Sequence, residues 1–392
     1  MYNERAFILG QSGCEIRELA AYGSARAAIV GPEKVYDFTI GNPSVPAPQE
    51  VTDTVLELMN SLHPVQLHSY TGASGEYDTR KAVAEDLNSR YDVELTPEEV
   101  FIGCGASQEL CAVFWALTRP KGEFVAIAPY FPEYMPFVEQ TGAAFRVVPA
   151  DIPDFQIDFA SLEQTLNENT CAGIINSPNN PAGTVYSRRT IEKLAALLTR
   201  KSREYGKPIY IVSDEPYREL VYDGVTVPYI PAIYPYTVVS YSYSKSLSLP
   251  GERIGYILVP GTNPEAKGLY TAVAGASRAL GHICAPSLWQ KVIARCTHLR
   301  PDLSVYDQNR KTLYEGLTAM GYEVAKPQGA FYLFVKAPGG DAKAFMEKAK
   351  EKDVLIVPGD GFGCPGYFRI CYCVSYEMIQ KSLPVFEELI KA

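Results

Sequence analysis

The sequence predicts an α/β protein in three layers, a mainly parallel sheet with helices on both faces, joined to a smaller α+β domain. Short apolar runs rich in Val, Ile and Phe alternate with helical stretches through the middle of the chain, which is typical of parallel sheets. Polar clusters directly follow three of these runs, where such sheets bind ligands. The 392 residues exceed what one hydrophobic core usually supports, so two domains are expected.

The large domain is expected at residues 46–285, because glycine and prolines crowd the segment 41–48 and mark a boundary. A helix over 49–61, a loop over 68–77 and a helix over 79–91 come first. The predicted strands then fall at 101–103, 123–128, 145–148, 172–176, 208–213, 237–241 and 254–259, with helices such as 190–205 between them.

The small domain is expected to combine residues 1–45 with residues 286–392. Its first part holds a helix over 12–30 and a short apolar run over 35–40. After 286 the pattern predicts a long helical stretch to 320 and a closing helix capped by Ser375. Between them lie predicted strands at 322–326, 330–336, 354–357 and 367–374, and a helix at 341–352.

Composition excludes several classes of function. The net charge of −9 argues against nucleic acid as a partner, because phosphate backbones need a basic face. No apolar run is long enough to span a membrane, and the first ten residues do not resemble a signal peptide. Nine cysteines without a C-x-x-C pair indicate reduced thiols in a cytoplasm. The cysteine and histidine spacings also predict no metal site, with Cys371 and Cys373 buried on one strand face.

The stretch YSYSKSLSLPGERIGY, residues 241–256, carries the most specific chemistry. Its single lysine, Lys245, can form a Schiff base with an aldehyde cofactor. The hydroxyls of Ser242 and Ser244 and the guanidinium of Arg253 are donors that suit a phosphate group. Taken alone, the stretch would fit a surface loop with a solvated lysine equally well.

A second anion-binding signal lies at residues 103–109, where a predicted strand runs through a turn of small residues into a helix. Gly105, Ala106 and Ser107 occupy that turn, and such turns aim free backbone N–H groups at an anion. Gln108 replaces the third glycine of a G-x-G-x-x-G motif, so the turn is a weak signal by itself.

Further motifs follow in a fixed order. Tyr130 lies in APYFPEY, Asn180 in SPNNPAG and Asp214 in SDEPY, and Lys245 comes 31 residues after Asp214. This ordered set resembles the class I and II aminotransferases of the pyridoxal-phosphate-dependent fold type I superfamily. The resemblance runs from residue 40 to Arg369, nearly the whole chain.

The resemblance implies a role for each matched residue. Lys245 would carry pyridoxal 5′-phosphate as an internal aldimine and then act as the base that moves the substrate proton. Asp214 would pair with the pyridine nitrogen, which makes the ring a better sink for electrons. Asn180 and Tyr217 would bond the ring oxygen O3′, and Tyr130 would stack on the ring.

The remaining matches concern the phosphate and the substrate. Arg369 would fork onto the substrate α-carboxylate beside Gly41 and Asn180. Tyr70 would reach the phosphate of a neighbouring subunit, which implies a homodimer with shared active sites. The phosphate itself would be held by Gly105, Ala106, Ser107, Ser242 and Arg253; Ser244 lies outside the matched positions and is left out of this predicted site.

The expected activity is therefore that of an aminotransferase, with aspartate and 2-oxoglutarate as the leading substrates. Arg278 lies close to a place where dicarboxylate-specific relatives carry a basic residue, so we consider it for the distal carboxylate. A pyridoxal-phosphate-dependent C–S β-lyase of the same fold would use the same Lys245. A regulator that borrows the fold would need a DNA-binding domain, for which Gly41 comes too early. The preferred amino acid and oxo acid, the oligomer beyond a dimer and the extent of domain closure stay open.

Overall fold

The structure, a computed structural model, describes residues 2–11 and 15–391. Its largest feature is a seven-stranded sheet in the order β2-β8-β7-β6-β5-β3-β4. Strand β8 runs in the direction opposite to that of the other six strands. The α/β class predicted from the sequence is thereby confirmed. The strands are β2 (Val100–Gly103), β3 (Glu123–Ile127), β4 (Ala144–Val148), β5 (Thr170–Asn176), β6 (Tyr210–Asp214), β7 (Thr237–Ser242) and β8 (Gly255–Leu258).

Helices cover both faces of this sheet because its central strands are apolar on both sides. Along β3, Phe124 and Ala126 join the core beneath α6 and α11, whereas Val125 and Ile127 join the core beneath α9. A further core forms where α3, α5 and α12 meet β2 and β8. The helices of this part are α3 (Gln49–Ser61), α4 (Pro64–His68), α5 (Tyr77–Tyr91), α6 (Ala106–Leu117), α7 (Tyr134–Glu139), α8 (Phe159–Thr165), α9 (Arg188–Tyr205), α10 (Tyr243–Ser246), α11 (Ala266–Ala279) and α12 (Ser287–Cys296).

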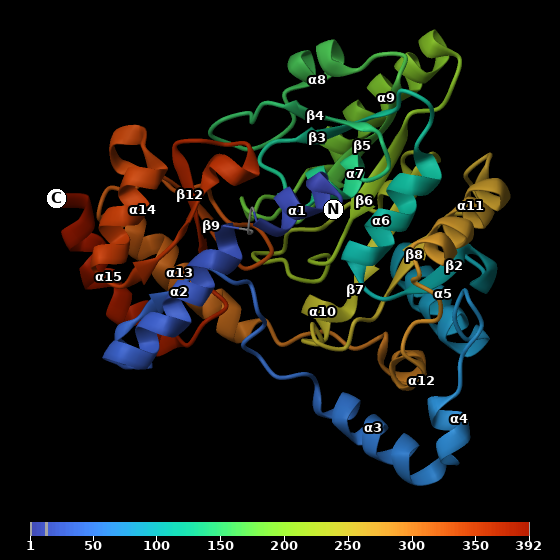
Figure 1. Ribbon diagram of the computed structural model, residues 1–392, viewed down its shortest axis with the longest axis horizontal. Helices are drawn as coiled ribbons and strands as arrows, with labels where there is room; N and C mark the ends of the chain where they lie inside the picture. Colours follow the sequence, from blue (N-terminus) through green and yellow to red (C-terminus); the bar gives the residue numbers. More distant parts are fainter. Residues whose placement is uncertain (1, 12–14, 392) are drawn as a thin grey trace.

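A second group of elements stands to one side of the large sheet (Figure 1). Two small sheets form its centre: β1 (Tyr36–Asp37) pairs in parallel with β10 (Val354–Leu355), and β12 lies between β11 and β9. The other elements of this group are β9 (Tyr332–Lys336), β11 (Val357–Pro358), β12 (Tyr367–Cys371), α2 (Glu15–Val30), α13 (Ser304–Ala319), α14 (Ala342–Glu351) and α15 (Tyr376–Lys391). Helix α1 (Glu4–Gln11) lies instead beside α7, where Arg5 pairs with Glu139 at 2.9 Å (Figure 1). The domain division at residues 46 and 285 stays a prediction, and α12 packs against α3 and α5 of the large sheet's side.

Several predicted elements differ in the structure. The long helix predicted from 286 to 320 is two helices, α12 and α13, because Pro301 between them cannot continue a helix. Residues 322–326 form no strand; Val324 makes only an isolated bridge to Val335. The run 354–357 divides between β10 and β11, which belong to different sheets. Helices α1, α4 and α10 were not predicted, and residues 12–14 of the predicted first helix lie outside the described residues.

Other predictions agree closely with the structure. Helix α3 spans the predicted residues 49–61, and the hydroxyl of Ser375 accepts a hydrogen bond from the backbone of Met378 at 3.2 Å, as a helix cap does. Cys371 and Cys373 are buried with their sulfur atoms 3.2 Å apart. Within residues 2–11 and 15–391, no helix combines the length and the apolar character needed to cross a membrane.

Candidate active site

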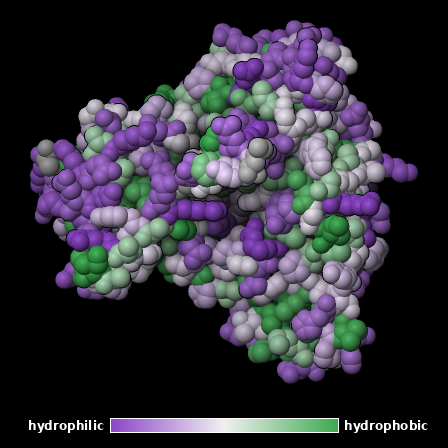
Figure 2. Space-filling model, viewed as in Figure 1, coloured by the Kyte–Doolittle hydropathy of each residue, from purple (hydrophilic) through white to green (hydrophobic). Residues whose placement is uncertain are grey.

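A cavity of about 360 Å³ lies between the two groups of elements, at the carboxyl ends of the parallel strands. The same face of the molecule is hollowed near its middle (Figure 2). Residues far apart in the chain, from Ile16 to Arg369, line this cavity. Ten of the predicted site residues are among them: Gly41, Ala106, Ser107, Asn180, Asp214, Tyr217, Ser242, Lys245, Arg253 and Arg369.

Lys245 lies in α10, directly after β7. Its amine donates a hydrogen bond to the backbone oxygen of Gly41 at 2.6 Å, and no carboxylate pairs with it among the described residues. Burial lowers the pKa of the Lys245 amine. A larger fraction of the Lys245 side chain is therefore neutral than in an exposed lysine, and the neutral amine is the form that attacks a carbonyl carbon.

Asp214 ends β6 on the floor of the cavity and is buried, with 5% of its surface exposed. One carboxylate oxygen, Oδ2, accepts hydrogen bonds from Tyr134 at 2.5 Å and from Asn176 at 3.4 Å. The other oxygen, Oδ1, is buried without a hydrogen-bond partner in the described residues. Burial raises the pKa of this carboxyl to about 7. An unpaired buried carboxylate oxygen is costly, so its persistence indicates a missing donor or cation.

Hydroxyl and guanidinium donors gather at the start of α6. Ser242 and Ser244 lie with their hydroxyl oxygens 2.7 Å apart, and Arg253 donates to Ser244 at 3.4 Å. Gly105 stands behind them with a φ of +90°, and a Cβ there would lie 2.6 Å from Arg253. A side chain at Gly105 would thus push the guanidinium out of place, and together these groups suit a phosphate beside the helix N-terminus at Ala106.

Arg369 of β12 is 2% exposed on the other side of the cavity. It donates to Asn180 Oδ1 at 2.9 Å and to the backbone oxygen of Thr39 at 2.5 Å, and its Nε is buried without a partner in the described residues. Tyr217 shares a hydrogen bond of 2.8 Å with Tyr332, which also lines the cavity. Arg369 therefore keeps a donor for a ligand while its plane is held by two fixed acceptors.

Four residues considered from the sequence do not line the cavity: Gly105, which lies behind Arg253, and Tyr130, Tyr70 and Arg278. Tyr130, predicted to stack on a ring, packs instead against Phe145 with ring centroids 5.2 Å apart, and its neighbour Phe131 lines the cavity. The geometry therefore favours Phe131 for the stacking role. Tyr70 is 97% exposed, and Arg278 is exposed in the last turn of α11. Neither of these two side chains reaches the cavity of its own chain.

Other residues at the cavity lie outside the predicted site. Ser244 lines the cavity between Ser242 and Lys245; its hydroxyl suits a phosphate, but the resemblance leaves it out of the predicted site. Tyr134, which ends the same APYFPEY motif as Tyr130, does not line the cavity and donates to Asp214 on its floor. Arg17 of α2 carries no local motif that would connect it with a site more than 200 residues away in sequence.

These groups fit pyridoxal 5′-phosphate. The buried, unpaired oxygen of Asp214 suits the protonated nitrogen of a pyridine ring, since a cation there would satisfy it. The amine of Lys245 suits the aldehyde. The donors around Arg253 suit the phosphate, and Phe131 offers an aromatic face.

Comparison with known proteins points in the same direction. The family model described as Aminotransferase class I and II matches residues 33–385. An aspartate aminotransferase of Thermotoga maritima is 30% identical over 375 residues, 94% of each chain, and aromatic-amino-acid aminotransferase 2 of Thermococcus litoralis is 27% identical over 92% of this chain and 93% of its own. A crystal structure of an aminotransferase from Eubacterium rectale is 55% identical, with a TM-score of 0.98 over 100% of this chain and 98% of that one.

Proposed function

This chain belongs to the class I and II aminotransferase family, and we propose that it moves the amino group of an acidic L-amino acid, aspartate above others, to 2-oxoglutarate. The protein is an aminotransferase, and its family uses pyridoxal phosphate. The choice among substrates is open, since the similar proteins include both an aspartate and an aromatic-amino-acid aminotransferase.

Bound pyridoxal phosphate supplies a carrier for the amino group and a sink for the electrons released when the substrate Cα loses its proton. In our proposal Lys245 would hold the cofactor through its aldehyde and, as a free amine, would carry the proton from the substrate Cα. Its lowered pKa supports this, because a base must be unprotonated to accept a proton. Asp214 holds a proton on the ring nitrogen, an ion pair worth roughly 4 kcal/mol at 4 Å and an effective dielectric constant near 20.

The remaining contacts follow from the cavity wall. Asn180 and Tyr217 would bond the ring oxygen, and Phe131 would cover the ring face. Gly41 lines the cavity with its backbone, and a side chain is excluded there because a Cβ would lie 2.3 Å from the hydroxyl of Tyr332. Arg369 would bind the α-carboxylate through its Nε–H, the donor for which the described residues offer no acceptor.

The charges of the cavity carry the proposal of an acidic substrate. Among the described residues that line it, Arg17, Lys245, Arg253 and Arg369 are basic, and Asp214 is the only acid. In this proposal Lys245 and Arg253 bind the cofactor, and Arg369 binds the α-carboxylate. Arg17 is then left over, without a hydrogen bond or ion pair to any described residue. A second carboxylate on the substrate would match it.

The experiment compares Arg17→Gln with Arg278→Gln, an exposed arginine outside the cavity. For Arg17→Gln we expect kcat/KM for L-aspartate to fall about 10- to 100-fold, the range of a hydrogen bond to a charged group. The value for L-phenylalanine should change little, because that substrate has no second carboxylate. Arg278→Gln should leave both substrates unchanged in steady-state assays with 2-oxoglutarate.

Equal losses for aspartate and phenylalanine in Arg17→Gln would contradict the proposed specificity. A larger aspartate-specific loss in Arg278→Gln would return the role to that residue. Release of pyruvate and a thiol from a cysteine conjugate, without any amino-group transfer, would favour the C–S lyase over the aminotransferase.

We also propose a homodimer with shared active sites. Tyr70 is 97% exposed, which is unusual for a tyrosine, and the preceding helices α3 and α4 also carry exposed apolar residues, Leu56, Met59 and Val65. Exposed apolar groups that gather on one face are typical of an interface. Sedimentation of the cofactor-bound protein should give twice the mass of the chain, and the mass of a single chain would contradict the proposal.

A further inference from the structure

Two segments set the distance between Lys245 and Asp214. Lys245 follows β7, and Asp214 ends the neighbouring strand β6, where it pairs in register with Ser240. The backbone N–H of Glu215 donates to Ser240 at 2.9 Å, and this is the last contact of the ladder. Beyond it, the backbone of α10 is held beside β8 by a bond from Tyr243 to Ile254, and the described ladder gives no further backbone bond to β6. Side chains therefore complete the connection between the Lys245 and Asp214 segments.

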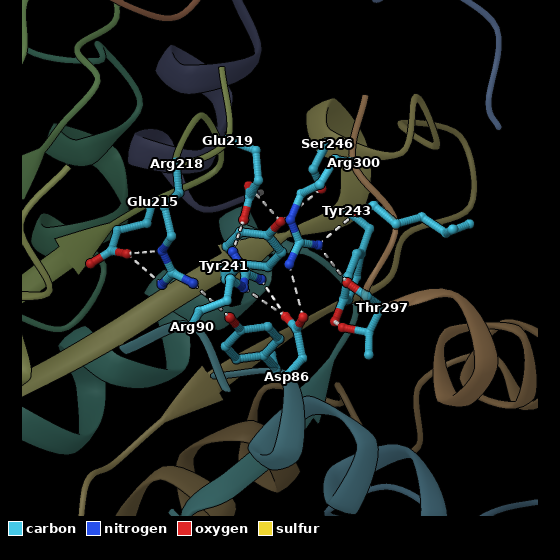
Figure 3. A network of polar contacts seen from close by, with 12 residues as sticks. Asp86, Arg90, Glu215, Arg218, Glu219, Tyr241, Tyr243, Ser246, Thr297 and Arg300 are labelled. Carbon is cyan, nitrogen blue, oxygen red and sulfur yellow. Dashed lines mark hydrogen bonds and ion pairs between the residues drawn. The ribbon is translucent and has the colours of Figure 1, made fainter. Parts of the chain in front are cut away.

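A chain of hydrogen bonds joins the two segments. The hydroxyl of Tyr241 lies 2.7 Å from Glu219 Oε2 and 2.7 Å from the hydroxyl oxygen of Ser246 (Figure 3). A phenol has a single proton and a carboxylate can only accept one, so Tyr241 donates to Glu219 and accepts from Ser246. Glu219 comes five residues after Asp214, and Ser246 directly follows Lys245.

The Glu219 end of this chain is anchored in turn. Arg90 of α5 pairs with Glu219 Oε1 at 2.6 Å and donates to Asp86 at 2.9 Å (Figure 3). The Glu219 side chain is 5% exposed, so solvent screens the pair little. A buried carboxylate with both oxygens bonded holds one position, and Glu219 can therefore serve as a fixed reference point.

The ring of Tyr241 is also held. The guanidinium of Arg218 lies 4.9 Å from its centroid on one side, and the ring of Tyr256 stacks against it at 4.9 Å. Arg218 itself donates to the hydroxyl of Tyr256 at 3.0 Å and pairs with Glu215, and both charged side chains are at most 3% exposed. The hydroxyl of Tyr241 thus points in a single direction.

We propose that the Glu219–Tyr241–Ser246 chain positions Lys245 relative to Asp214. None of its three members lines the cavity, so each is a positioning residue and not a catalytic one. This inference rests on the proposed function, because the alignment matters only where Lys245 and Asp214 act on one cofactor.

The test is Tyr241→Phe, which removes the hydroxyl and keeps the ring between Arg218 and Tyr256. Tyr243→Phe is the matched control: Tyr243 is 1% exposed, and its hydroxyl shares one hydrogen bond of 2.7 Å with Thr297, away from residues 214–219. For Tyr241→Phe in the holoenzyme we expect kcat to fall roughly tenfold with little change in KM, since a small displacement of a reacting group is costly. The control should stay within about twofold of the wild type.

A second readout does not depend on turnover. In the cofactor-free protein, the rate at which an amine-reactive reagent labels Lys245 can be followed against pH by mass spectrometry. The midpoint of this curve should shift in Tyr241→Phe and not in Tyr243→Phe. The thermal unfolding temperature should fall in both variants, and further in Tyr241→Phe, because the Tyr241 hydroxyl makes two buried hydrogen bonds and the Tyr243 hydroxyl one.

Identical labelling curves and identical kcat values in the two variants would overturn the inference and leave the chain with a structural role only. If Tyr241→Phe fails to fold, Ser246→Ala cuts the other bond of the chain and should move kcat and the labelling midpoint in the same direction. Failure of the proposed function would look different: the wild type would transfer no amino group, while the labelling comparison would still decide the inference.

Discussion

Two groups of buried charges, one lining the cavity and one forming the network of Figure 3, satisfy their polar atoms differently. In the cavity, Asp214 and Arg369 each keep one buried polar atom without a hydrogen-bond partner in the described residues. In the network of Figure 3, both oxygens of Glu219 are bonded, to Arg90 and Tyr241. The cavity therefore reserves its donors and acceptors for ligands, whereas the network uses them to hold the protein together.

The contrast has a cost in stability. A buried polar atom without a partner destabilises the folded state by about 1–3 kcal/mol, and a ligand that supplies the partner recovers this energy as binding. A buried ion pair with good geometry contributes roughly nothing to the net free energy of folding. Removing one member is costly, however, because it leaves the other charge buried without a counter-charge. Substitutions in the two regions should thus have opposite effects on the stability of the cofactor-free protein.

The largest effect is expected at Lys245. Lys245→Ala removes both the covalent anchor of the cofactor and the base, and the loss of a base alone lowers kcat by about 10²- to 10⁴-fold. Borohydride reduction followed by mass spectrometry should attach the cofactor mass to the wild type and not to the variant. A variant that retains more than about a tenth of the wild-type kcat would contradict this role, because that loss lies below the range for a general base.

The next largest effect is expected in the network. Arg218→Met keeps most of the apolar stem but leaves Glu215 buried without its partner, so the free energy of unfolding should fall by about 3–5 kcal/mol. Urea denaturation of the cofactor-free protein measures this change. Arg188→Met, which breaks an exposed pair with Glu192, is the control and should cost at most about 1 kcal/mol. Equal losses in the two variants would remove the distinction between the network and the surface.

A smaller effect on stability, of opposite sign, is expected for Asp214→Asn. Burial raises the pKa of Asp214 from 3.8 to about 7, so the unfolded chain loses its proton first and stability falls as the pH rises between these values. Asparagine has no such loss. The cofactor-free variant should therefore unfold at a higher temperature than the wild type at pH 8 and at nearly the same temperature at pH 4.

The same substitution should lower kcat by about 10²- to 10³-fold, the usual effect of removing a preorganised electrostatic contact. Stability would then rise while activity falls, as expected for a group retained for function. A cofactor-free Asp214→Asn variant that is less stable than the wild type at pH 8 would show that the carboxylate is already satisfied by the protein.

The sequence predicts some residues of the site better than others. Five residues belong to motifs whose order along the chain is specific, and the structure brings them into one cavity: Lys245, Asp214, Asn180, Arg253 and Arg369. Local sequence could not tell which of the adjacent aromatic residues at 130 and 131 turns inward, because that depends on how the chain leaves β3.

Long-range contacts were beyond the sequence for a related reason. Arg17 reaches the cavity from α2 without any motif, and Arg90 and Glu219 meet although 129 positions separate them. Such contacts depend on how helices pack against the sheet, and no local pattern records that packing. The division of the long predicted helix into α12 and α13 could have been predicted from Pro301, because proline cannot continue a helix. The amphipathic pattern on both sides of Pro301 obscured this signal.

The most direct measurement is the visible absorption spectrum of the purified protein with pyridoxal phosphate, before and after L-aspartate is added without an oxo acid. The account predicts a visible absorption band that is absent when Lys245 is replaced. The band should fade when aspartate is added, and one oxaloacetate should form per active site. Absence of the band despite added cofactor would contradict the assignment of Lys245 and Asp214, and with it the claim that the unpaired atoms of the cavity await this ligand.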